Sequence, residues 1–173
     1  MRWSGWCVNL CLWPMLLASC SDSIGDSPVP AGEVRYSCTL ATINLIMEQG
    51  DPQTPLESMG GYVRCYDRQK MAGNEAWGTG GLLLVHGYED VAYYAYDLAC
   101  PYCWVANGAS AAKIQQLVIA DDCQTARCAT CESRFGAIFW GSPAPTAGPA
   151  NESNYPLRQY RASLVGDKLV VRN

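Results

Sequence analysis

The sequence predicts an all-β domain, and three features support this prediction. The 173-residue chain contains 16 glycines and 10 prolines but only 2 phenylalanines, a composition that favours turns and strands over long helices. Short apolar runs rich in β-branched and aromatic residues alternate with polar turns, as they do in antiparallel hairpins. The sequence contains no internal repeat and no long amphipathic pattern. We therefore expect a single antiparallel β-domain over residues 34–173.

The first 19 residues are typical of a signal peptide. Arg2 is followed by an apolar run that ends in Leu17-Ala18-Ser19-Cys20 and is too short for a comfortable membrane span. Small residues directly before a cysteine resemble the lipobox of a bacterial lipoprotein, in which the new N-terminal cysteine takes the lipid. We expect Cys20 to anchor the exported protein to a membrane of the bacterial cell envelope. An uncleaved anchor or an ordinary secretory leader is the alternative.

A flexible tether is expected over residues 20–33, because Ser, Asp, Gly and Pro dominate there without apolar periodicity. Residues 34–47 are richer in β-branched and apolar side chains, which predicts one or two opening strands, and residues 59–65 predict another strand with a glycine entry. Three hairpins should follow, formed by residues 80–86 with 91–97, residues 114–119 with 124–127, and residues 157–164 with 168–171.

Two C-x2-C pairs have the spacing of a metal site. Cys100-Pro-Tyr-Cys103 and Cys128-Ala-Thr-Cys131 are separated by 24 residues. Two cysteines at this spacing can turn both sulfurs into one tight loop, here called a knuckle, and two facing knuckles form a tetrathiolate cage for zinc or iron. Because each knuckle follows a predicted hairpin strand, we expect both to lie at hairpin tips and to meet.

The remaining cysteines do not complete a disulfide framework. Without Cys7, Cys11 and the lipidated Cys20, seven cysteines remain, and an odd number cannot all be paired. We interpret Cys38, Cys65 and Cys123 as small buried side chains, or as one disulfide and one free thiol.

The order of these parts resembles the Rieske iron-sulfur domain, and more closely the exported Rieske-like lipoproteins. The resemblance extends from about Gly60 to the C-terminus. Its most specific motifs are Ala95–Pro101, Cys128–Phe135, Gly148-Pro149-Ala150 and Leu157–Val171. It implies a Rieske-like antiparallel β-sandwich into which a small cluster-binding subdomain is inserted.

The ligand set departs from that family, in which two cysteines bind one iron and two histidines bind the other. Cys100 and Cys128 fall on the family's cysteine positions, whereas Tyr102 and Cys131 fall on its histidine positions. The chain has one histidine, His86, in a strand upstream of both motifs, so an iron with two histidine ligands is excluded. Cys103 and Cys131 are the available replacements.

Three interpretations of the four sulfurs remain open. They can hold a [2Fe-2S] cluster and make the protein a one-electron carrier for an envelope redox partner. Four thiolates would then shift the potential away from the Rieske range, toward the plant-type value of about −400 mV. They can instead hold Zn²⁺ without redox chemistry, in a structural or interaction module. They can also form disulfides after export, since Arg2 stands alone where a twin-arginine leader for folded proteins has two arginines.

Composition also excludes some functions. With 12 basic and 16 acidic residues the net charge is −4, so the chain offers no basic face for a nucleic acid. One histidine and the absence of a G-x-S-x-G motif leave hydrolase chemistry without support, and no other enzymatic site is visible.

Overall fold

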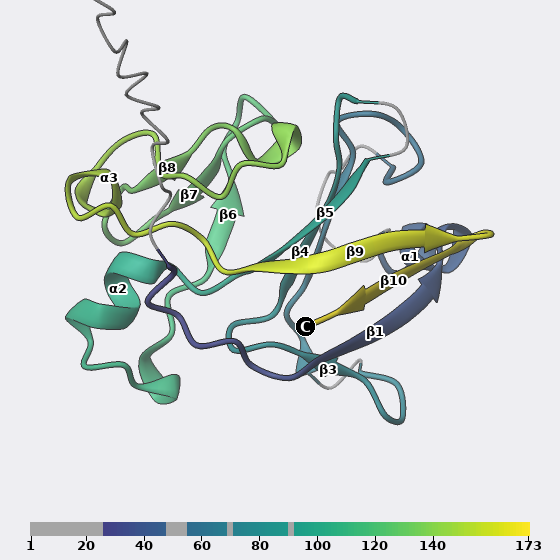
Figure 1. Ribbon diagram of the computed structural model, residues 1–173, viewed down its shortest axis with the longest axis horizontal. Coiled ribbons are helices and arrows are strands. Elements are labelled where there is room, and N and C mark those ends of the chain that lie inside the picture. The colour runs from purple at the N-terminus through teal and green to yellow at the C-terminus, as the bar shows by residue number, and fades with distance from the viewer. Residues whose placement is uncertain (1–25, 48–54, 69–70, 90–91) are drawn as a thin grey trace, which may run out of the picture.

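The computed structural model describes residues 26–47, 55–68, 71–89 and 92–173, and these form a mostly β protein (Figure 1). The strands are β1 (Val34–Thr39), β2 (Tyr62–Cys65), β3 (Ala76–Trp77), β4 (Leu82–His86), β5 (Tyr93–Asp97), β6 (Leu117–Ile119), β7 (Ala126–Cys128), β8 (Arg134–Phe135), β9 (Gln159–Val165) and β10 (Lys168–Arg172). The helices are α1 (Leu40–Met47), α2 (Pro101–Ala106) and α3 (Pro149–Glu152), with short 3₁₀ turns η2 (Ala111–Lys113) and η3 (Ile138–Trp140). The predicted all-β class is confirmed.

Seven strands form one antiparallel sheet in the order β2-β4-β5-β9-β10-β1-β3. Strand β9 connects its two halves, because Tyr160 pairs with Ala95 of β5 while residues 161–165 pair with β10. The halves fold over a shared core, to which β1 and β10 contribute from one side and β2, β4 and β5 from the other. This large sheet is the base of the molecule.

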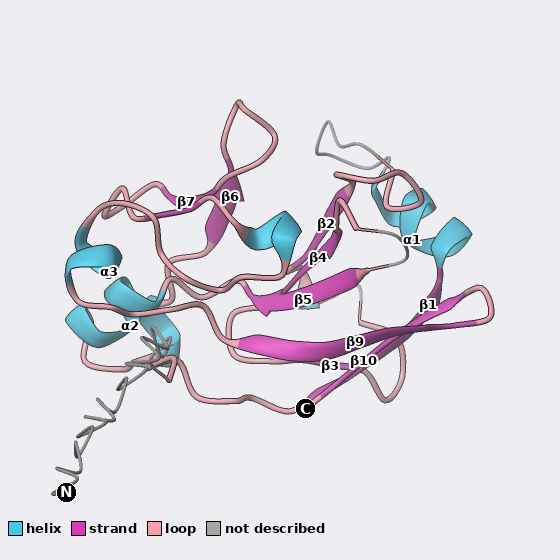
Figure 2. Ribbon diagram, turned by 45° about the horizontal axis from the view of Figure 1, so that its top comes forward, coloured by secondary structure: helices cyan, strands magenta, loops and turns pink. Residues whose placement is uncertain are grey.

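A second, three-stranded sheet in the order β6-β7-β8 is inserted between β5 and β9 (Figure 2). Together with α2, η2, η3 and α3, it forms what we call the inserted subdomain, residues 98–158. It packs on the outer face of the base, where Leu83 and Val85 of β4 share a buried cluster with Leu117, Phe135 and other side chains of the subdomain. All five residues of β4 are therefore buried.

The backbone pattern explains why β4 has no exposed face. Alternate side chains of a strand point to opposite sides of the sheet. Leu82 and Leu84 accordingly enter the core between the halves of the base, whereas Leu83 and Val85 enter the cluster under the inserted subdomain. The Tyr96 hydroxyl donates a hydrogen bond of 2.9 Å to the Ile138 carbonyl and adds a polar link between the two parts.

The three predicted hairpins are present, as β4-β5, β6-β7 and β9-β10. Two local predictions were wrong. Residues 40–47 form helix α1 rather than a second opening strand, and the first cysteine pair begins helix α2 rather than occupying a hairpin tip. The predicted signal peptide, Cys20 and the tether up to residue 25 lie outside the described residues. The described part of the predicted tether is held to the domain, because Arg158 bonds to the Ser27 and Val29 carbonyls and the Val29 side chain is buried. Among the described residues, no helix is long and apolar enough to cross a bilayer.

Candidate metal centre

The structure brings together all four cysteines of the two C-x2-C pairs. The sulfurs of Cys100, Cys103, Cys128 and Cys131 lie within 4.8 Å of one another, so these residues can hold a metal ion. The Sγ of Cys100 is 3.6 Å from that of Cys131, and the Sγ of Cys103 is 3.7 Å from that of Cys128. The first three side chains are buried and Cys131 is half-buried.

The two knuckles repeat the same backbone geometry. The N–H of Trp104 donates to the Cys100 carbonyl at 2.9 Å, and the N–H of Glu132 donates to the Cys128 carbonyl at the same distance. In each knuckle the N–H of the second cysteine also bonds to the sulfur of the first. The chain diverges afterwards, because Pro101 at the first helical position favours continuation into α2. Glu132 instead adopts a φ of 59° and turns the chain away.

Backbone contacts within the inserted subdomain position the knuckles. The Cys100 N–H donates to the Gln115 carbonyl at 2.8 Å, and the Cys128 N–H donates to the Ser133 carbonyl at 3.0 Å. Gly148 in the proline-rich loop has a φ of 76°, and a Cβ there would lie 2.9 Å from the backbone of Glu132 and Ser133. Only glycine allows this loop to approach the second knuckle so closely.

Ser133 connects the second knuckle to that loop. Its hydroxyl oxygen, fully buried, accepts the Ala150 N–H at 3.0 Å and the Cys131 thiol at 3.1 Å. If Cys131 were a metal-bound thiolate, the same hydroxyl could donate a hydrogen bond to the sulfur. Hydrogen bonds of this kind orient a ligand and tune the metal.

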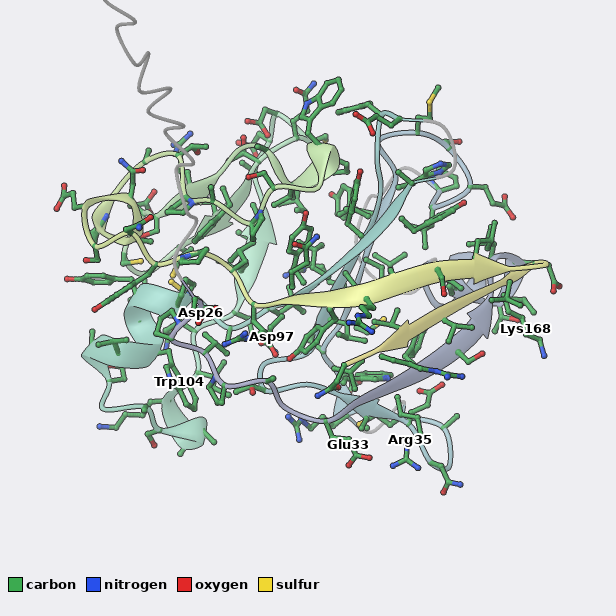
Figure 3. The ribbon with its side chains drawn as sticks, in the orientation of Figure 1. Asp26, Glu33, Arg35, Asp97, Trp104 and Lys168 are labelled. Atoms are coloured by element: carbon green, nitrogen blue, oxygen red, sulfur yellow. The ribbon has the colours of Figure 1, made fainter. Side chains whose placement is uncertain are left out.

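Asp97 fixes the end of β5, three residues before the first ligand, and is fully buried (Figure 3). One carboxylate oxygen accepts the N–H groups of Gly80 and Ala99 at 2.8 Å, and the other accepts the Thr79 N–H at 2.7 Å and the Tyr160 hydroxyl at 2.8 Å. Burial raises the pKa of Asp97, and these four hydrogen bonds oppose that effect. Asp97 belongs to the Ala95–Pro101 motif, but its position in the sequence does not predict this role.

The thiols are electrostatically coupled. Hydrogen bonding from the Cys100 thiol, helped by the N–H groups of Cys131 and Thr130, lowers the pKa of Cys128 to about 5. The pKa of Cys100 rises because its proton is held by Cys128, and burial raises the pKa of Cys103 to about 12. Four thiolates therefore require a cation among them, since like charges at this distance disfavour one another.

The same geometry bears on the disulfide interpretation. All seven cysteines of the described residues are free thiols, and the closest sulfur pairs are far longer than a disulfide bond of about 2.05 Å. These pairs join different knuckles.

The other candidate residues have structural environments. His86 is buried, with Nδ1 2.9 Å from the Leu56 carbonyl and its ring stacked on Tyr93. Cys65 is buried in the base and Cys38 is half-buried against the same core, whereas Cys123 is exposed in the β6-β7 turn. None of these joins the four-cysteine group.

Comparison with known proteins adds no assignment. No protein-family model, no curated protein and no solved structure matches this chain. The resemblance to the Rieske-like lipoproteins thus stays a prediction, and the function must be inferred from the site itself.

Proposed function

We propose that this protein is a lipid-anchored domain of the bacterial cell envelope whose inserted subdomain is fastened by one Zn²⁺ ion bound to Cys100, Cys103, Cys128 and Cys131. The observation that carries the proposal is the mutual proximity of the four sulfurs, all within 4.8 Å. Four thiolates around one zinc at about 2.3 Å have tetrahedral edges of about 3.8 Å. The sulfur pairs at 3.6 and 3.7 Å are close to that edge.

A closed tetrathiolate site is the usual form of structural zinc, because no coordination position remains for a substrate. The short strands β6, β7 and β8 supply few backbone hydrogen bonds, and the ion would join the segment after β5 to the turn after β7. In this interpretation the protein acts as a structural or interaction module.

Metal analysis of the protein purified from membranes tests the proposal directly. We expect one zinc per chain and no visible absorption. The C128S variant should lose the metal, whereas C123S, which changes an exposed cysteine outside the site, should keep it. An intact mass lowered by the hydrogens lost on disulfide formation, with no metal bound, would overturn the proposal.

A one-electron carrier with a [2Fe-2S] cluster is the second candidate. It is favoured by the hydrogen bond between Ser133 and the Cys131 sulfur, a contact able to tune a redox potential. Two irons would require the ligand pairs to move apart, because each pair must bind a different metal atom. Equal amounts of iron and acid-labile sulfide, with visible absorption bleached reversibly by dithionite, would establish this candidate in place of zinc.

The anchor is tested separately. The N-terminal peptide of the membrane-purified protein should begin at Cys20 and carry acyl chains, detectable by mass spectrometry. The C20A variant should lose them. An unmodified Cys20 in the membrane-bound protein would contradict lipid anchoring without bearing on the metal.

A further inference from the structure

The segment that follows the first knuckle is exposed and uncharged. Residues 98–112 contain no Asp, Glu, Lys or Arg. Val105 is 43% exposed, and the alanines at 106, 109, 111 and 112 are exposed as well. Trp104 is half-buried, and it is not among the described side chains that pack against either core, whereas its neighbour Tyr102 is. We call residues 104–112 the α2 surface.

The described chain begins beside this surface. Figures 1 and 2 both place its first residues next to α2. The start is fixed rather than loosely attached, because Arg158 donates hydrogen bonds to the Ser27 carbonyl at 2.7 Å and to the Val29 carbonyl at 2.9 Å. The Val29 side chain is fully buried.

The length of chain before Asp26 limits how far the anchor can lie from this surface. Asp26 lies six positions after Cys20, with five residues between them. Even fully extended, six residues span only about 20 Å. A lipid on Cys20 would therefore hold the α2 side of the domain close to the bilayer. This step rests on the lipid attachment proposed above.

We propose that the α2 surface is a membrane contact, with Trp104 and Val105 inserted at the interface of the lipid bilayer. Tryptophan prefers the interfacial region, and because residues 98–112 carry no charge, Trp104 and Val105 can enter it without desolvating an ion of this segment. Lys113, exposed at the end of η2, lies where it can meet lipid phosphates. Because α2 begins at the first knuckle, the metal centre would lie beside the membrane surface.

Fluorescence quenching by brominated phosphatidylcholine tests the contact in the lipidated protein reconstituted in vesicles. The chain from Cys20 onward contains Trp77, Trp104 and Trp140, of which Trp77 is buried and Trp140 is 60% exposed on η3. We expect quenching in the wild type, its loss in W104F and its retention in W140F. V105D should reduce quenching while the metal content stays unchanged.

Two outcomes would overturn the inference, and they differ in what else they refute. If Cys20 carries a lipid but W104F is quenched as strongly as the wild type, the membrane contact is wrong and the anchor stands. If mass spectrometry finds no lipid on Cys20, the anchor is refuted and the inference fails with it.

Discussion

The base and the inserted subdomain are built by different means. The base has strands of up to seven residues and a core shared by its two halves. The inserted subdomain has strands of only two or three residues, which cannot form a stable sheet alone. Its four buried or half-buried thiols lie beside these short strands. Burial of apolar side chains stabilises the base, whereas the subdomain depends on docking to the base and, in our proposal, on a metal ion bound by its four cysteines.

Removal of the metal should have the largest effect. The apparent binding free energy of a structural Zn²⁺ is about 10–16 kcal/mol, so removal of one of the four proposed ligands should weaken metal binding strongly. In C128S we expect the amides of residues 117–135 to lose protection from hydrogen exchange, while those of β4, β5, β9 and β10 keep it. Global unfolding, or full protection of the subdomain, would contradict the division between the two parts.

Two neighbouring leucines of β4 face different cores, so their substitution distinguishes the two parts of the molecule. Leu83 and Leu84 are both fully buried, but Leu83 faces the inserted subdomain and Leu84 faces the interior of the base. Each substitution by alanine should cost about 2–5 kcal/mol. In L83A, backbone amides should lose protection from hydrogen exchange mainly in the subdomain. In L84A, they should lose protection throughout the base. Identical exchange patterns in both variants would show that the parts unfold as one unit.

Asp97 belongs to the junction between the two parts. The D97N substitution replaces one acceptor oxygen by an NH₂ group, which then faces the buried donors that Asp97 binds. It should lower the free energy of unfolding by about 2–4 kcal/mol, as measured by chemical denaturation. Asp122 is a matched control, because it accepts hydrogen bonds from the Gln124 and Thr125 N–H groups in an exposed turn. D122N should cost much less. Equal losses would mean that the burial of Asp97 is unimportant.

Local patterns in the sequence predicted much of the base. The β4-β5 and β9-β10 hairpins were found because alternating apolar residues and turn residues specify them over short distances. Helix α1 was missed because Thr42, Ile43 and Ile46 have the β-branched character of a strand. Thr39 is the residue in the sequence that indicates a helix start here. Its hydroxyl accepts the Thr42 N–H at 3.2 Å, as the side chain of an N-cap residue does.

The convergence of the four cysteines was predictable for a similar reason. Each knuckle is specified by its own C-x2-C spacing, and the structure confirms that the two knuckles meet. The pairing of Cys100 with Cys131 and the role of Asp97 were not predictable, because they depend on contacts between residues far apart in the chain. Asp97, for example, requires both Thr79 and Tyr160.

The smallest expected effect concerns Ser133. The S133A substitution removes the acceptor of the buried Ala150 N–H and the hydroxyl beside the Cys131 sulfur. We expect a loss of about 1–2 kcal/mol in unfolding free energy, together with weaker zinc retention in competition with a chelator. Ser142 is the control, because its hydroxyl also accepts a backbone N–H, that of Ala144 at 3.3 Å, but neither residue belongs to the metal site.

S142A should therefore leave zinc retention unchanged. If S133A lowers stability but retains zinc as the wild type does, Ser133 only supports the proline-rich loop. If both properties change together, the hydrogen bond to the sulfur couples that loop to the metal, and the subdomain closes around the ion as a unit. The ratio of the two effects thus measures how strongly the loop depends on the metal rather than on its docking to the base.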